Sequence, residues 1–237
     1  MNKTGDTKKA ETAVRTDKYP HSDNDWENFD VLHINRLPSA ATFMAYTTKE
    51  KAVKNDKSQS EYFQSLNGTW KFQFVPRSDQ RPMDFFEKGH DVSGWGNIKV
   101  PANWEMEGYG HPFYVGAGYG IKRNPPLIAV ENSPVGSYKR TFNVPANWKG
   151  KQIVLHFGGV ASAFYVWVNG EKVGYSQDSK TPSEFDITPY AVTGQNEIAV
   201  QVFKFSDGYY LEDQDYWRFA GIQRVPLCPS QHPRARL

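Results

Sequence analysis

Short runs of alternating apolar and polar residues dominate the chain and predict β-strands. The plainest run covers residues 68–75, where the rings of Trp70, Phe72 and Phe74 alternate with polar side chains. Residues 197–205 repeat this period of two, which places alternate side chains on one face of a strand. Further strands are predicted over residues 98–100, 136–144, 152–157, 161–168, 172–175 and 185–187.

The connections between these runs predict hairpins rather than helical crossovers. Asn169-Gly170 separates two apolar runs and is a strong signal for a two-residue hairpin. Short helices are expected near residues 48–54 and around residues 83–87, and residues 102–134 are expected to form a long irregular excursion. Many short strands with hardly any helical periodicity predict an all-β fold, an antiparallel β-sandwich.

Changes in residue pattern divide the chain into four segments. Residues 1–24 are polar and are expected to form a disordered leader, because they hold too little apolar surface to offset their ordering entropy. Residues 25–60 are expected to form an extended N-terminal arm lying over a sandwich of residues 61–224. Residues 225–237 contain three prolines and are expected to form an irregular tail, as at the end of a truncated gene, a frame-shifted gene or an expressed fragment.

Composition narrows the possible partners. Hydrophobic residues make up 38% and aromatic residues 15% of the 237 positions, so a sizeable core built largely from rings is expected. A net charge of +2 does not favour nucleic acid or a membrane surface as a partner. The single cysteine, Cys228, excludes an internal disulfide and a cysteine-based metal site. The N-terminus lacks the apolar region of a signal peptide, which leaves a cytoplasmic and, after signal removal, a periplasmic location open.

The stretch richest in candidate chemistry is residues 203–222, which read F-K-F-S-D-G-Y-Y-L-E-D-Q-D-Y-W-R-F-A-G-I. Four carboxylates, of Asp207, Glu212, Asp213 and Asp215, lie among seven aromatic rings. Carboxylates held close together need a cation or hydrogen-bond donors, and hard cations prefer oxygen ligands. Rings beside carboxylates also suit a sugar. A solvated acidic turn whose rings belong to the core explains the same residues equally well.

Four blocks in this sequence resemble one protein family. They are D-G-x-Y-L-E-D-Q-D-x-W-R-x-x-G-I (residues 207–222), G-Y-S-Q-D-S-K-T-P-S-E-F-D-I-T (174–188), V-P-A-N-W-E-M-E-G-Y (100–109) and D-W-E-N (25–28). In their order along the chain, the blocks resemble the N-terminal sugar-binding domain of glycoside hydrolase family 2 β-galactosidases. The resemblance spans residues 25–224 and implies the jelly-roll form of the sandwich, similar to galactose-binding domains.

The resemblance implies a function without catalysis in this chain. Such domains belong to enzymes that hydrolyse terminal β-galactosides in carbohydrate metabolism, and they contribute part of the substrate pocket. The retaining mechanism uses two carboxylates, which in this family lie in a downstream barrel domain. No catalytic residue is therefore expected here, and the chain alone is expected to be inactive. The expected partners are a β-galactoside and the downstream barrel.

The same resemblance implies which residues contact the sugar. Asp215 matches the carboxylate that contacts the galactosyl C6 hydroxyl and helps to ligate Na⁺, although it could instead accept hydrogen bonds from Arg218. Tyr114 and Gly116 lie in the loop that carries the other pocket contact. The family usually has an asparagine where this chain has Gly116, and glycine has no side chain to hydrogen-bond the sugar.

A divalent-cation site is the second implication. In the family, Mg²⁺ or Ca²⁺ ties the N-terminal arm to the sandwich. Its ligands fall on Asp25, Asn28, the backbone oxygen of Val31, Gln177 and Asp207. All are oxygen donors, as a hard cation requires. The alternative is that Asp25 and Asn28 merely cap a turn after the leader.

Other residues invite a function but are expected to be structural. Glu184 is expected to close a turn, and Trp104 and Trp167 to pack in the core or between domains. Two further functions remain possible: a stand-alone, lectin-like carbohydrate-binding module and a structural interaction domain. The exact sugar and the oligomeric state are left open.

Overall fold

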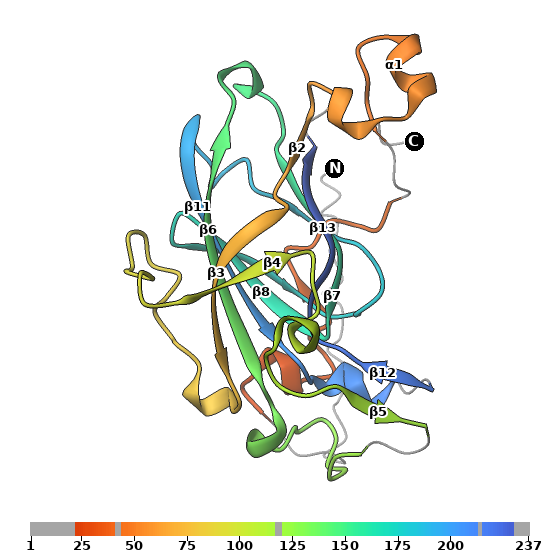
Figure 1. Ribbon diagram of the computed structural model, residues 1–237, viewed down its shortest axis with the longest axis vertical. Helices are drawn as coiled ribbons and strands as arrows, with labels where there is room; N and C mark the ends of the chain where they lie inside the picture. Colours follow the sequence, from red (N-terminus) through yellow and green to blue (C-terminus); the bar gives the residue numbers. More distant parts are fainter. Residues whose placement is uncertain (1–21, 41–43, 117–119, 213–214, 230–237) are drawn as a thin grey trace, which may run out of the picture.

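The computed structural model describes residues 22–40, 44–116, 120–212 and 215–229. These residues form thirteen strands in three antiparallel sheets, one α-helix and seven 3₁₀ helices. Two larger sheets face each other across the core, and the third sheet forms a separate ribbon at the bottom of Figure 1. The predicted antiparallel jelly-roll sandwich is thereby confirmed.

The larger sheet holds seven strands within the described part of the chain. In spatial order they are β1 (His33–Ile34), β9 (Glu171–Ser176), β8 (Ala163–Val168), β11 (Gly194–Phe203), β6 (Val135–Val144), β3 (Gly68–Val75) and β4 (Gly96–Val100). The long pairing of β11 with β6 runs from Gly194 opposite Val144 to Phe203 opposite Val135. This pairing forms the centre of the sheet.

The remaining described elements complete the second layer, the ribbon and the connections. The four-stranded sheet consists of β10 (Ser183–Asp186), β7 (Val154–Ala161), β13 (Gly221–Pro229) and β2 (Phe63–Ser65), and the ribbon of β12 (Tyr216–Arg218) and β5 (Phe113–Val115). The helices are α1 (Lys49–Lys54), η1 (Asp25–Glu27), η2 (Lys57–Gln59), η3 (Ser78–Gln80), η4 (Trp104–Glu107), η5 (Val130–Asn132), η6 (Ala146–Trp148) and η7 (Asp207–Tyr210).

Local sequence signals explain the elements that were predicted. The alternating run at residues 68–75 forms β3. Asn169 and Gly170 both adopt positive φ angles, 53° and 91°, which suit the tight hairpin between β8 and β9. The helix predicted near residues 48–54 is α1: Thr48 accepts a hydrogen bond from Lys51 N–H at its start, and Asn55 ends it in the left-handed conformation. The helix expected around residues 83–87 is absent, because these residues form bends and turns.

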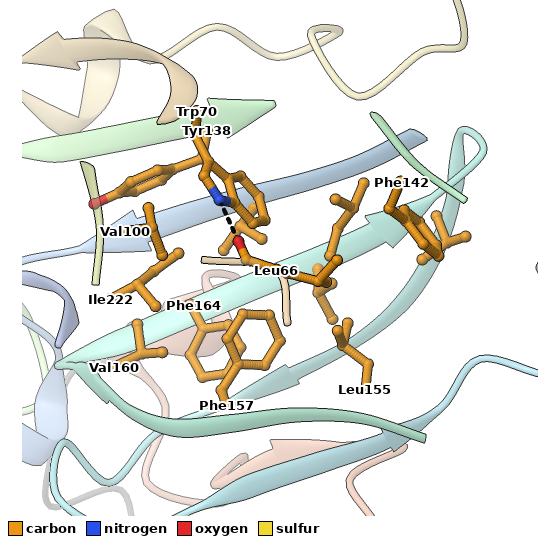
Figure 2. Packing of buried hydrophobic residues seen from close by; sticks show 14 of the residues in the cluster. Leu66, Trp70, Val100, Tyr138, Phe142, Leu155, Phe157, Val160, Phe164 and Ile222 are labelled. Atoms are coloured by element: carbon orange, nitrogen blue, oxygen red, sulfur yellow. Dashed lines mark hydrogen bonds between the residues drawn. The ribbon is translucent and has the colours of Figure 1, made fainter. Parts of the chain in front are cut away.

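The main core lies between the two larger sheets and consists largely of aromatic and branched side chains. Figure 2 shows Trp70 and Tyr138 of the larger sheet facing Leu155 and Phe157 of the smaller one. The indole Nε1 of Trp70 donates to the carbonyl of Leu66 at 2.9 Å, so this buried ring leaves no unpaired donor. Trp104, predicted as a packing residue, is fully buried here.

A second core covers the outer face of the larger sheet. Trp26 of the arm stacks on Phe203 of β11 with ring centroids 4.1 Å apart, and Phe86 stacks on Trp167 of β8 at 5.0 Å. All six residues of β8 are buried as a result. The arm also adds β1 to the edge of the sheet, and Leu37 N–H donates to the Glu184 carbonyl. The arm and the segment that carries Phe86 therefore cover together a face that would otherwise expose apolar side chains.

The last strand extends beyond the predicted start of the irregular tail at residue 225. β13 pairs with β7 as far as Leu227 and with β2 from Leu227 to Pro229. Prolines are tolerated near bulges and strand ends because no ladder hydrogen bond is lost there. β13 has a register shift between Ile222 and Arg224, and Pro229 is its last residue. Residues 230–237, and most of the predicted leader, lie outside the described part of the chain.

Two further expectations from the sequence need correction. Glu184 does not close a turn but lies within β10, where its carboxylate is 3.0 Å from Nδ1 of His156 on β7. The expected irregular excursion of residues 102–134 contains β5, a strand of only three residues. A strand this short shows no recognisable period in the sequence.

Close packing around a glycine of the main core yields a stability prediction. A Cβ atom at Gly136 would lie 2.5 Å from Trp104 and 2.7 Å from Phe72, whereas one at Gly94 would meet no atom within 4 Å. Neither glycine has a positive φ angle. Gly136→Ala should lower the free energy of unfolding by about 1–3 kcal/mol through overpacking. Gly94→Ala should change it by less than about 0.5 kcal/mol. Urea denaturation measures both, and equal effects would contradict this account of the core.

Candidate functional site

The ribbon of β5 and β12 brings together residues that lie about a hundred positions apart. Its register pairs Tyr216 with Val115, Trp217 with Tyr114, and Arg218 with Phe113. Because side chains alternate along a strand, partners directly opposite each other share a face. One face of the ribbon therefore carries Tyr114 and Trp217. The second face carries the other two pairs, Tyr216 with Val115 and Arg218 with Phe113.

The second face of the ribbon is anchored in the protein. Val115 and Arg218 are buried, and the Phe113 ring packs edge-on against Phe205 with centroids 6.2 Å apart. The Arg218 guanidinium lies 5.2 Å from the ring centroid of Tyr209 and donates to the backbone oxygen of Glu212. These contacts hold the short ribbon in place.

The first face is open to solvent and carries all three predicted sugar-contact residues. Tyr114, Gly116 and Asp215 are exposed, and the Tyr114 hydroxyl donates to Oδ1 of Asp215. This hydrogen bond raises the pKa of Tyr114 above its ordinary value, because removing its proton would place a second negative charge beside the carboxylate. Asp215 thus contacts Tyr114, whereas Arg218 lies on the buried face.

Gly116 leaves space beside the carboxylate. A Cβ atom built there would lie 3.5 Å from both Asp215 Oδ1 and the Tyr114 hydroxyl oxygen, which are ordinary contact distances. Its φ angle is not positive, so the backbone does not require glycine at this position. The lack of a side chain at residue 116 therefore opens the site without serving the local fold.

Sequence reasoning missed two features of this site. Trp217 lies two residues after Asp215, on the same face of the ribbon, and is 50% exposed. Because β12 spans only three residues, no period in the sequence marked this spacing. The side chain of Glu105 is buried; it binds Lys204 Nζ at 2.5 Å and accepts a hydrogen bond from Ala220 N–H, just after β12. This ion pair fixes the point where the chain leaves the ribbon.

A second cluster joins the arm to the sandwich. Nε2 of Gln177 lies 2.6 Å from Asp207 Oδ1, 2.8 Å from the Tyr175 hydroxyl and 3.4 Å from the Val31 carbonyl oxygen. Three of the predicted cation ligands therefore meet directly. In these three contacts, the partial positive charge among the oxygens comes only from the N–H groups of the Gln177 amide.

Asp207 is the buried carboxylate of this cluster. It is 1% exposed, and its Oδ2 has no hydrogen-bond partner among the described residues. Burial raises the pKa of Asp207 to about 6, although hydrogen bonds from Gln177 and from Gly208 N–H act in the opposite direction. A buried carboxylate with a free oxygen is an incomplete polar site.

The other two predicted ligands lie on or beside η1, which packs against η7. Asp25 Oδ2 accepts a hydrogen bond from the Tyr165 hydroxyl at 2.7 Å and lies 3.6 Å from Lys172 Nζ. Asn28 Oδ1 accepts from Asp30 N–H at 3.1 Å, which is a turn contact of the kind the alternative predicted. Asp215, also expected to bind a cation, lies on the ribbon and not in this cluster.

The described residues lack two kinds of feature. No group of three or more His, Cys, Asp and Glu side chains there is arranged to hold a metal ion. A cation in the arm cluster would therefore depend on amide and carbonyl oxygens as well as carboxylates. None of the helices in the described ranges is long and apolar enough to cross a membrane.

Curated proteins share much of the sequence. A β-galactosidase of Priestia megaterium is 44% identical over 228 residues, 94% of this chain and 22% of its own length. A β-galactosidase of Halalkalibacterium halodurans is 44% identical over 209 residues, 86% of this chain and 20% of its own length. The chain thus spans about a fifth of the length of these curated relatives.

Solved structures with lower identity share the fold alone. A β-glucuronidase of Bacteroides uniformis matches 71% of this chain and 18% of its own chain at 24% identity, with a TM-score of 0.54. A β-glucuronidase of Ruminococcus gnavus matches 73% of this chain and 30% of its own chain at 21% identity, with a TM-score of 0.52. The family model described as "Glycosyl hydrolases family 2, sugar binding domain" matches residues 63–228. The chain therefore belongs to glycosyl hydrolase family 2, and residues 63–228 are its sugar-binding domain.

Proposed function

We propose that this chain is the N-terminal sugar-binding part of a β-galactosidase and that its ribbon forms one wall of the galactoside pocket. The observation that carries the proposal is the contact between Asp215 and Tyr114 on the open face of the ribbon. The curated β-galactosidases that are 44% identical to this chain support it.

The chemistry of Asp215 suits a sugar hydroxyl. An ionised carboxylate has two oxygens and accepts several hydrogen bonds, and charge-assisted bonds to hydroxyls are strong. Tyr114 occupies Oδ1 and fixes the carboxylate, which leaves Oδ2 to accept from the C6 hydroxyl of a galactoside. The same anionic group suits Na⁺, a hard cation that would add positive charge beside the sugar oxygens.

Catalysis belongs elsewhere in this proposal. Retaining glycosidases need two carboxyl groups about 5–5.5 Å apart on either side of the glycosidic bond. Asp215 contacts a tyrosine on the ribbon and has no carboxylate partner at that position among the described contacts. We assign the catalytic pair to a downstream barrel domain, with the ribbon face turned toward the same substrate.

The open ribbon should bind a galactoside only weakly by itself. One wall offers few contacts, which barely offset the loss of translational and rotational freedom on association. Methyl β-galactoside should bind the isolated chain with a Kd of about 1 mM or weaker. Asp215→Asn should weaken binding about tenfold, since a neutral amide loses the charge-assisted bond. Exposed Asp91, which bonds Ser93, provides the control Asp91→Asn.

Calorimetric or NMR titration of the isolated chain measures both affinities. A micromolar Kd would contradict a one-wall pocket and favour a stand-alone, lectin-like module. Equal affinities for the Asp215→Asn and Asp91→Asn variants would contradict the role of Asp215.

We further propose a divalent cation in the arm cluster. The donor set fits Mg²⁺ or Ca²⁺, because it combines the carboxylates of Asp25 and Asp207 with oxygens of Asn28, Val31 and Gln177. The partnerless Oδ2 of Asp207 is the observation that supports it. Half a turn of the Gln177 amide would exchange its Nε2 for its Oε1, since the two ends have the same shape. A cation there would supply the charge that the amide now provides.

Bound cation should stabilise the chain by mass action. At about a hundred times the dissociation constant the gain is about 2.7 kcal/mol. The rise in melting temperature should be full above about pH 7 and shrink as the pH falls through 6, because the proton competes for Asp207, whose pKa is raised to about 6. EDTA should reverse it.

Asp207→Asn should abolish the thermal response to Mg²⁺ and Ca²⁺ while leaving the sandwich folded by circular dichroism. The matched control is Asp79→Asn, which removes an exposed carboxylate that pairs with Arg77. Melting curves unaffected by both cations and by EDTA would show that the arm cluster binds no cation.

A further inference from the structure

The open face of the ribbon carries large aromatic rings where a solvent-facing strand pair ordinarily carries polar side chains. Tyr114 is 51% exposed and Trp217 is 50% exposed, and they are direct cross-strand partners. Adjacent exposed rings of this size mark a surface that contacts something other than water. The ribbon packs against the protein through its second face, which is buried. Core packing therefore does not require aromatic rings on the open face.

The indole of Trp217 is held in one orientation. Phe219 stacks beside it with centroids 6.2 Å apart and an interplanar angle of 28°. Tyr114 lies against it at 5.4 Å with an angle of 55°. An oriented ring loses little conformational entropy when a ligand stacks on it.

Polar and open space adjoin the ring. Asp215 and Gly116 lie on the same face, and the vacant position beyond Gly116 borders both the carboxylate and the Tyr114 hydroxyl. A ligand above Trp217 would therefore meet an apolar ring beneath it and a hydrogen-bond acceptor at its edge. This combination is typical of sites that orient a sugar.

We propose that Trp217 is the stacking platform of this site and that it favours galactosides over glucosides. The proposal rests on the proposed function. In β-galactopyranose the axial C4 hydroxyl leaves the hydrogens of C3, C4 and C5 together on one face, which makes that face apolar. In β-glucopyranose the equatorial C4 hydroxyl places the C4 hydrogen on the opposite face. The positive edges of these C–H bonds suit the negative face of an indole.

Stacking and hydrogen bonding then act on the same sugar. The C–H face lies on Trp217, and the hydroxyls at the ring edge reach Asp215. Gly116 keeps the approach open, because any side chain at that position would occupy space between the carboxylate and the ligand. The platform therefore selects at C4, whereas Asp215 serves the hydroxyl at C6.

An NMR titration of the isotope-labelled chain tests the platform directly. The indole N–H signal of Trp217 should shift on addition of methyl β-galactoside and saturate at the same midpoint as the backbone signals of Tyr114 and Asp215. Methyl β-glucoside, which differs only at C4, should shift the indole signal less and bind several-fold more weakly. An equal indole shift with both sugars would overturn the selectivity.

Variants of Trp217 distinguish the effect of an aromatic ring from the effect of side-chain volume. Trp217→Ala should weaken galactoside binding about fivefold to tenfold, Trp217→Leu should weaken it nearly as much, and Trp217→Phe should stay within about twofold. Val53→Ala is the control, because Val53 is 77% exposed on α1 at the opposite end of the molecule. Melting temperatures of all variants establish that each is folded.

Each failure has its own signature. Unchanged affinity in Trp217→Ala, together with a galactoside response that Asp215→Asn removes, overturns the platform and leaves the proposed function standing. No response anywhere on the ribbon at the highest soluble galactoside concentration overturns both.

Discussion

Burial of both faces of the larger sheet is the constraint on which the other features depend. Every residue of β8 and the last six residues of β11 are buried. One face packs against the smaller sheet, and the other needs a separate cover. The arm supplies one part of it, with Trp26 stacked on Phe203 and β1 hydrogen-bonded to β9, and Phe86 supplies another part by stacking on Trp167. A sheet that is apolar on both sides is stable only when both sides are withdrawn from water.

That cover also creates the arm cluster. β11 ends at Phe203 and η7 begins at Asp207, so the arm that covers the end of β11 lies beside the buried carboxylate. Val31 of the arm and Gln177 after β9 meet Asp207 there. Burial without a full set of partners raises the pKa of Asp207 to about 6, because the ionised carboxylate lacks the charge compensation that water would give it.

Contacts with the rest of the protein hold the ribbon in place. Three-residue strands have little stability alone, and the anchoring comes from Arg218 beneath the ribbon and from the Glu105–Lys204 ion pair at its exit. Because one face carries the structural contacts, the opposite face is free to present Tyr114, Asp215 and Trp217 to solvent. This separation into a packed face and an open face follows from the alternation of side chains along a strand.

The sequence by itself determined the fold class and the locally encoded elements. The alternating run that forms β3, the pattern of β11 and the Asn169-Gly170 hairpin all depend on neighbours within a few residues. The sequence also led to Asp215 and Tyr114, but only through resemblance to known blocks. Periodicity alone did not connect them.

Tertiary structure decided the rest, because the remaining contacts join residues far apart in the chain. β5 and β12 are too short to show a period and become strands only by pairing with each other, which brings Tyr114 to Asp215 across 101 positions. β13 continues through its prolines because β7 and β2 flank it. The exposure of Trp217 and the burial of Asp207 depend on which surfaces the folded body covers, and neither property is written in the residues next to them.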